Sequence, residues 1–237
     1  MTVSTGFNRK IQKWVLNEEG KITFHPFKVD GNPYKSKVFL VSATPEPYLS
    51  VDPRDLKLHI DSLVDSTTFQ DLYFDELKAT SREYKGSLNF VNWAKEQLKE
   101  NVVLTYINSL NLDNPQHLKL LKKQKDPLYQ QGLKVFKEVL VEFSPSILII
   151  QGTTAWKQFL EQFETHLMDF EATGLTVQQL ESKGVIAKLQ LENGVVADIL
   201  VCRSMGYFGK EGASFAEFKK TLEQLLISGK TERSCRS

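Results

Sequence analysis

The chain has 237 residues, of which 41% are hydrophobic and 25% charged, and its formal net charge is +1. This composition is typical of a globular protein with one large domain or two small ones. No stretch approaches the roughly 20 apolar residues that a membrane-spanning helix needs, and the first six residues lack the charged-then-apolar order of a signal peptide. We therefore expect a cytoplasmic protein without a membrane anchor.

The first clear element is a strand at residues 38–42, preceded by a short helix expected over residues 7–17. The strand is a run of apolar residues bounded by turn formers, which suits a position covered on both faces of a sheet. Pro45 and Pro47 lack a backbone donor, so the strand must end before them. Residues 1–35 are expected to pack as an extension on the domain that follows.

The rest of the chain alternates between helical and strand patterns. Helices are predicted at 66–80, 87–99, 127–143, from about 153 and at 213–227, and strands at 102–107 and 147–150. Near the end, residues 186–191 and 195–201 flank Asn193-Gly194, a strong hairpin signal. Residues 229–237 have nothing apolar to bury, and we expect them to be a disordered tail.

Strands that alternate with helices imply a mostly parallel sheet with helices on both faces. We therefore predict an α/β protein: a single-domain three-layer α/β/α fold over residues 1–228, with a mostly parallel central sheet and a C-terminal hairpin. No linker rich in Gly or Ser divides the chain.

The cysteine and histidine residues give no spacing typical of a metal site or a disulfide framework. Cys202 ends an apolar run and is expected in the core, whereas Cys235 lies in the polar tail. We expect neither a metal nor another cofactor. The densest basic cluster, residues 119–125, is interpreted as a solvated helix face, with phosphate contact as the alternative.

The predicted strands end in polar or small residues, which is where ligands bind in open α/β sheets. Asn and Gln amides present a paired donor and acceptor that match the edge of a nucleobase, and aromatic rings can stack on it. The strand ends supply Ser42, Thr44, Glu46, Asn108, Asn111, Gln151, Gly152, Arg203 and Ser204, with Tyr48, Tyr106 or Phe208 for stacking. The alternative is that these side chains only satisfy loop backbone, because polar residues follow strands in any α/β protein.

Motifs of several enzyme classes are absent. The sequence has no Gly-x-x-x-x-Gly-Lys-Ser/Thr phosphate loop, no Gly-x-Gly-x-x-Gly after the first strand and no Gly-x-Ser-x-Gly nucleophile elbow.

The order of parts over residues 37–227 resembles the uracil-DNA glycosylase superfamily. Members have a Gly-x-x-Pro loop after the first strand and an asparagine after the second, then a Gly-x-x-Ala loop and finally a loop of His-Pro-Ser type. The matching segments here are Ser42-Ala43-Thr44-Pro45, Thr105-Tyr106-Ile107-Asn108, Gly152-Thr153-Thr154-Ala155 and Arg203-Ser204-Met205-Gly206.

The resemblance implies a cleft that reads a base in DNA or RNA and a hydrolase of N-glycosidic bonds, as in DNA repair. The catalytic residues it implies are Thr44 and Glu46, which would handle water, and Arg203, which would offset charge on the departing base. Together with the strand-end pattern, it gives Ser42, Pro45, Tyr48, Asn108, Gln151, Gly152 and Ser204 as the expected substrate-binding residues.

Two departures from the family support a second interpretation. Ala43 and Thr44 stand where members carry an Asp, Asn or Glu, and the last loop has no histidine. The alternative is an inactive relative that binds nucleic acid, a nucleotide or a protein. A third interpretation is an α/β enzyme that uses the same strand ends for a small metabolite. We expect a monomer, and the sequence does not identify the substrate.

Overall fold

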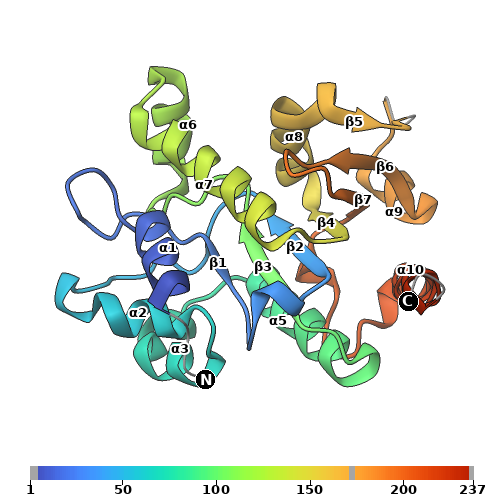
Figure 1. Cartoon of the computed structure of the whole chain (residues 1–237), viewed down its shortest axis with the longest axis horizontal. Coiled ribbons are helices and arrows are strands. Elements are labelled where there is room, and N and C mark those ends of the chain that lie inside the picture. Colours follow the sequence, from blue (N-terminus) through green and yellow to red (C-terminus); the bar gives the residue numbers. More distant parts are fainter. Residues whose placement is uncertain (1–4, 171–173, 235–237) are drawn as a thin grey trace.

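A seven-stranded mixed sheet forms the centre of the protein, as the computed structural model of residues 5–170 and 174–234 shows (Figure 1). The strands are β1 (Phe27–Lys28), β2 (Val38–Ser42), β3 (Val102–Tyr106), β4 (Ile147–Gln151), β5 (Leu167–Met168), β6 (Val185–Gln190) and β7 (Val196–Cys202). Their order is β1-β3-β2-β4-β7-β6-β5. The four central strands β3, β2, β4 and β7 are parallel, and β1, β6 and β5 are antiparallel to their neighbours. The predicted α/β class is confirmed, and β6 and β7 form the predicted hairpin.

The helices differ from the prediction mainly at their boundaries. They are α1 (Thr5–Val15), α2 (Leu56–Ser62), α3 (Ser66–Leu72), α4 (Phe74–Lys78), α5 (Arg82–Trp93), α6 (Pro115–Gln124), α7 (Pro127–Phe143), α8 (Gly152–Phe163), α9 (Val177–Lys183) and α10 (Ala216–Ser234). A π-helical turn, Ala94–Leu98, continues α5, and short 3-10 turns include Met205–Tyr207. The predicted helix at 66–80 is two helices, because Tyr73 leaves helical geometry at φ −116° and ψ 31°.

Three further predictions about helix ends need correction. The first turn of α5 lies before residue 87, because the Ser81 side chain caps the helix by accepting from the Tyr84 amide. The cap of α8 is Gln151 rather than a threonine, and its side chain makes no capping bond. α10 runs to Ser234, into the segment predicted as a tail, and Cys235 lies outside the described residues.

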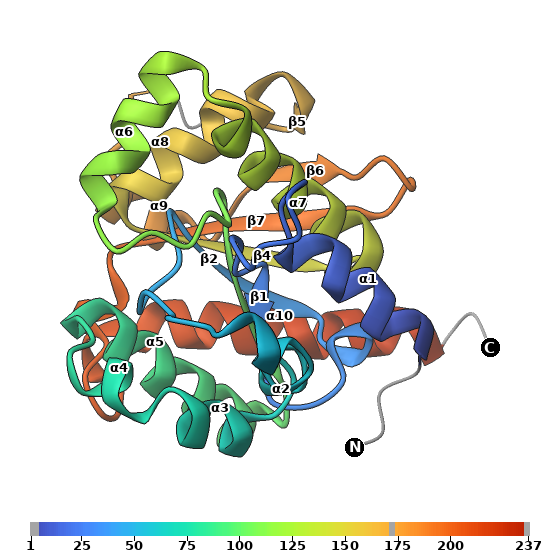
Figure 2. The ribbon, with the colours of Figure 1, turned by 90° about the vertical axis from the view of Figure 1, so that its left-hand side faces the viewer.

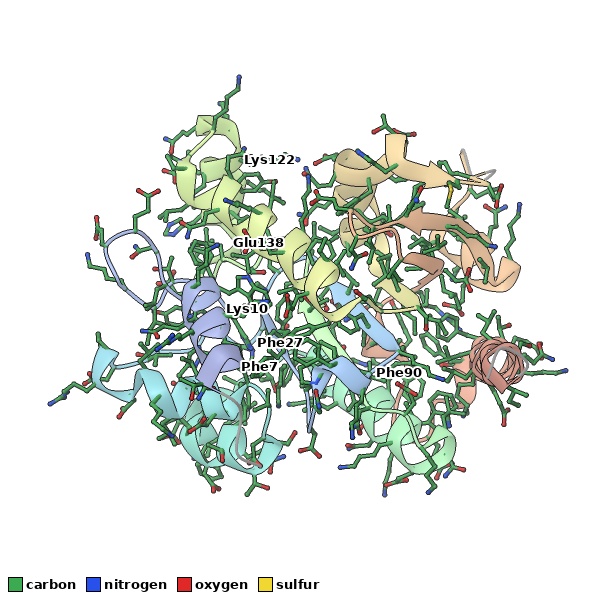
Figure 3. All side chains as sticks on the ribbon, viewed as in Figure 1. Phe7, Lys10, Phe27, Phe90, Lys122 and Glu138 are labelled. Atoms are coloured by element: carbon green, nitrogen blue, oxygen red, sulfur yellow. The ribbon has the colours of Figure 1, made fainter. Side chains whose placement is uncertain are left out.

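Two apolar layers cover the sheet, one on each face (Figure 2). α7 and α8 pack on one face, and α5 and α10 pack on the other. Side chains of β2 alternate between the layers: Phe39 and Val41 face α7, whereas Val38 and Leu40 face α5. Figure 3 shows the contrast at Phe27, in the first layer, and Phe90, in the second.

The loop after β7 lies directly against α5. A Cβ atom built on Gly86 of α5 would be 1.8 Å from the Met205 carbonyl oxygen. Only a glycine permits the helix to approach the loop this closely, so Gly86 fixes the position of α5 relative to the ends of the strands.

We expect Gly86→Ala to lower the free energy of unfolding by roughly 1–3 kcal/mol, because the added methyl group must displace the Met205 backbone. Urea denaturation measures the change. Gly6→Ala is the matched control in a helix, because a Cβ there meets no atom within 4 Å, and it should leave stability unchanged or slightly raised. Equal effects of both substitutions would contradict the close contact.

Candidate functional site at the strand ends

The side-chain amide of Gln151 joins the ends of the strands. Its Nε2 donates to the hydroxyl of Ser42 at 2.6 Å and to that of Ser87 at 3.0 Å, and its Oε1 accepts from the Met205 amide at 3.2 Å. Gln151 is only 2% exposed. The carboxyl ends of β2 and β4, helix α5 and the loop after β7 therefore meet around one buried amide.

The end of β3 belongs to the same edge. The backbone amide of Asn108 donates to the Ala43 carbonyl at 3.2 Å. The Asn108 side chain is fully buried: its Nδ2 donates to the Tyr129 carbonyl at 3.0 Å, and its Oδ1 accepts from the Leu110 amide at 3.1 Å. In this arrangement, the side chain predicted to read a base instead holds the loop against α7.

The loop after β2, residues 43–53, is fastened at two points. Asn111 pairs with both backbone groups of Leu49, donating to its carbonyl at 2.8 Å and accepting from its amide at 3.0 Å. The carboxylate of Glu46 accepts from the amide and the hydroxyl of Ser81, at 2.5 and 2.6 Å. Because Ser81 caps α5, Glu46 ties this loop to the start of that helix. Thr44 and Pro45 lie between these anchors and are half-buried.

The loop after β7 uses its polar side chains in a similar way. Ser204 donates to the Glu83 carboxylate of α5 and accepts from the Gly206 amide at 3.2 Å. Arg203 pairs with Glu181 of α9 at 3.1 Å, and its guanidinium also donates to the Ser214 carbonyl. None of these groups belongs to the loop that carries Thr44 and Glu46. The Arg203 guanidinium therefore bonds to α9 and to the chain before α10, rather than to Thr44 or Glu46.

Several other predicted residues also lie at this edge. Gly152 begins α8 with φ +80°, and a Cβ there would lie 3.9 Å from the Ser204 Cα, so the two loops are close neighbours. Of the three rings predicted for stacking, Tyr106 and Phe208 are buried, at 3% and 1% exposure. Tyr48 is 44% exposed and remains available.

An exposed aromatic ring and a cation, which were not among the predicted site residues, lie on the same edge. Tyr207 is 60% exposed, and the guanidinium carbon of Arg82 lies 5.7 Å from the centre of its ring. Arg82 follows Ser81, to which Glu46 is bonded. The start of α5 thus connects Tyr207 with the loop that carries Tyr48. In the sequence, the only sign of Tyr207 was its position in the loop after β7.

A buried polar cluster lies beside this edge. The ring centre of His25 is 5.2 Å from that of Tyr106 and 6.5 Å from that of His59, which bonds to the Tyr73 hydroxyl at 2.6 Å through Nδ1. Lys28 of β1 donates to the Tyr84 hydroxyl at 3.3 Å. These residues come from separate segments, so no spacing in the sequence indicated that they meet.

Burial keeps most of this cluster uncharged near neutral pH. It lowers the pKa of His59 to about 4 and holds the pKa of His25 well below its ordinary value, where the charges of His59 and Lys28 add to the effect and the Phe27 backbone opposes it. Burial also lowers the pKa of Lys28 to about 8 and raises that of Tyr106 well above its ordinary value.

The hollows on the surface lie away from the strand ends. Two hollows of about 670 and 630 Å³ lie between α1 and α7, and both are lined by Trp14 and Glu138 rather than by residues of the strand ends. Lys122 of the basic cluster on α6 is 2.5 Å from Glu161 (Figure 3). Within residues 5–170 and 174–234, no three His, Cys, Asp or Glu side chains are placed to hold a metal ion, and no helix could cross a membrane.

Neither models of known protein families nor curated proteins match the sequence.

We expect Gln151→Leu to lower the free energy of unfolding by roughly 2–3 kcal/mol, because it leaves buried polar partners unpaired. Urea denaturation measures this loss. Gln190→Leu, at an exposed position at the end of β6, is the matched control and should change stability little. If the two variants are equally stable, the amide of Gln151 does not hold the strand ends together.

The buried imidazoles predict a loss of stability in acid. A histidine whose pKa is lower in the folded state stabilises the fold fully above its unfolded pKa of about 6.5, and that stability is lost as the pH falls toward the folded value. For His59 the window is from about 6.5 down to about 4, with a loss of roughly 3 kcal/mol. Urea denaturation between pH 7.5 and 4.5 measures it.

The variants for this pH experiment are His25→Phe and His166→Gln. His25→Phe should weaken the pH dependence, because it removes one buried imidazole. His166 is exposed, so His166→Gln should retain the dependence. A pH dependence unaffected by His25→Phe would contradict the assignment to this cluster.

Proposed function

We propose that the protein binds unpaired bases of a nucleic acid at the C-terminal edge of its parallel strands, without hydrolysing them. The observation that carries the proposal is the exposed Tyr207 ring with Arg82 beside it, connected through the start of α5 to the loop that carries Tyr48. Exposed rings stack on any base face, and arginine adds attraction to rings and phosphates. The parallel arrangement of four strand ends is also what the resemblance to uracil-DNA glycosylases requires.

The bonding of the polar side chains favours binding over hydrolysis. A general base must reach a water molecule or the substrate, but both carboxylate oxygens of Glu46 accept from Ser81. The guanidinium of Arg203 is paired with Glu181 and the Ser214 carbonyl. The Thr44 hydroxyl is too weak a base to take a proton from water near neutral pH. An inactive relative therefore fits these contacts better than an active glycosylase.

The second candidate is a hydrolytic enzyme in which Glu46 would act on the attacking water. This carboxylate is half-buried in the loop after β2, where family members place a residue that acts on water. A shift of Ser81 would free it. A cytoplasmic location, a monomeric state and independence from cofactors also stay predictions.

Fluorescence anisotropy with a labelled single-stranded oligonucleotide tests the binding proposal. We expect Tyr207→Ala to weaken binding about tenfold, because one stacked base is worth roughly 1–3 kcal/mol. Arg82→Gln should reduce the dependence of affinity on salt concentration. Val196→Ala removes an exposed side chain from the opposite end of β7 and should bind like the wild type. Equal affinity of wild type and Tyr207→Ala would refute the proposed surface.

The same oligonucleotides, carrying uracil or hypoxanthine, distinguish binding from hydrolysis. We expect no alkali-sensitive abasic sites after incubation with the wild-type protein. Abasic sites that form with the wild type but not with Glu46→Gln would establish the hydrolytic candidate instead.

A further inference from the structure

The two hollows between α1 and α7 adjoin each other, and we call them together the α1–α7 groove. Their volumes are about 670 and 630 Å³, and they share the lining residues Lys13, Trp14, Lys134 and Glu138. Figure 3 labels Lys10 of α1 and Glu138 of α7, where the two helices meet. Each volume lies within the range of ligand pockets. The groove is separate from the exposed aromatic surface at the strand ends.

The groove follows the length of α7. Its lining begins at Pro127 and ends at Glu142, and a rise of 1.5 Å per residue gives this stretch a length of about 22 Å. An extended peptide rises about 3.3 Å per residue, so about seven residues of a peptide would fill it. Leu128 and Val141 are half-buried in the lining, one in each hollow, and offer apolar contacts to such a peptide.

Two carboxylates that line the smaller hollow are already bonded within the protein. Glu142 accepts from the ammonium group of Lys10 through one oxygen and from the hydroxyl of Tyr34 through the other, both at 2.5 Å. Glu138 accepts from the indole nitrogen of Trp14 at 2.8 Å. These bonds fix the two carboxylates on α7, so they do not neutralise the other cations of the hollow.

Three cations in the same lining have no carboxylate partner. Arg9 and Lys13 lie four residues apart on one face of α1 and are exposed, and neither makes a hydrogen bond or an ion pair within the described part of the chain. Lys137 of α7 lies 5.5 Å from the centre of the Phe163 ring, and no described carboxylate pairs with it. The smaller hollow therefore has unpaired positive charge from both helices.

The distribution of charge favours a protein segment over a nucleic acid. Glu18 lines the larger hollow and Glu192 the smaller one, and both are exposed. A nucleic-acid strand carries a phosphate at every nucleotide, so a strand along the groove would place phosphates near these carboxylates. A peptide can carry its carboxylates only where the cations lie, and such complementarity provides specificity.

We propose that the α1–α7 groove binds an extended acidic segment of a partner protein. The carboxylates of the segment pair with Arg9, Lys13 and Lys137, and its apolar side chains contact Leu128 and Val141. This site does not depend on nucleic-acid binding at the Tyr207 surface.

Fluorescence anisotropy with a labelled heptapeptide of alternating glutamate and leucine tests the proposal in the full chain. The control peptide has glutamine in place of each glutamate. We expect the acidic peptide to bind at least tenfold more tightly, with an affinity that falls as salt is added. The double variant Arg9→Gln and Lys13→Gln should weaken binding of the acidic peptide about tenfold, because two exposed ion pairs are lost.

Two control variants separate the groove from other surfaces. Lys119→Gln combined with Lys123→Gln removes the same charge from exposed positions on α6 and should bind the acidic peptide like the wild type. Tyr207→Ala should also bind it like the wild type. All the replaced lysine and arginine side chains are exposed, so these variants should fold.

Nuclear magnetic resonance of the tryptophan indoles locates the bound peptide. The Trp14 indole lines the groove and bonds to Glu138, so its signal should shift when the acidic peptide is added. Trp156 lies on α8 and does not line the groove, so its signal should stay in place.

Four results would overturn the proposal. The first is equal binding of the two peptides by the wild type. The second is an equal loss of affinity in the α1 and α6 double variants, which would show general attraction to positive charge. The third is binding without a shift of the Trp14 signal. The fourth is a shift of this signal with protein concentration alone, which would make a second copy of the chain the occupant.

Discussion

The structure of the strand ends depends on one buried amide. Gln151 ends β4 and bonds to the end of β2, to α5 and to the loop after β7. In a parallel sheet the carboxyl ends of the strands lie at one edge, but this alone does not fix the distances between the loops that follow them. The Gln151 amide decides how closely the loops and the helix approach, and Gly86 permits the contact by leaving room for the Met205 carbonyl. The loops at this edge are therefore joined to one another and to α5 through Gln151.

The same bonding supports the function that we propose for this edge. Asn108, Glu46, Ser204 and Arg203 each bond to the protein itself, so the polar side chains that a base-hydrolysing enzyme would use serve here to hold loops. The exposed side chains Tyr48, Tyr207 and Arg82 provide two aromatic rings and a cation at this edge. Such a surface can stack on bases and attract phosphates, which is why we favour binding over hydrolysis.

The parts of this structure that could be predicted from the sequence are those determined by local pattern. The apolar runs at 38–42 and 147–150 predicted central strands because a strand covered on both faces must be apolar throughout. The Asn193-Gly194 turn predicted the β6–β7 hairpin for a similarly local reason. Tyr73 was not predicted to divide a helix, because its departure from helical geometry accompanies tertiary contacts with Leu49 and His59.

Side-chain bonding at the site could not be predicted, because it depends on partners distant in the sequence. Asn108 finds the carbonyl of Tyr129, 21 positions away, and Gln151 finds Ser42, 109 positions away. A polar residue after a strand looks the same in the sequence whether it binds a ligand or a loop. The sequence also did not predict that His25 and His59 meet. Each alone resembles an ordinary core residue, and only the fold brings the two rings together.

The most direct test of the central claim is to map the binding surface in solution. Backbone amide signals of the full chain would be followed by nuclear magnetic resonance during titration with a single-stranded oligonucleotide. The account predicts shifts concentrated at Tyr48, at Ser81 and Arg82 at the start of α5, and at the 3-10 turn Met205–Tyr207. Shifts concentrated instead around Trp14 and Glu138, in the hollows between α1 and α7, would contradict it.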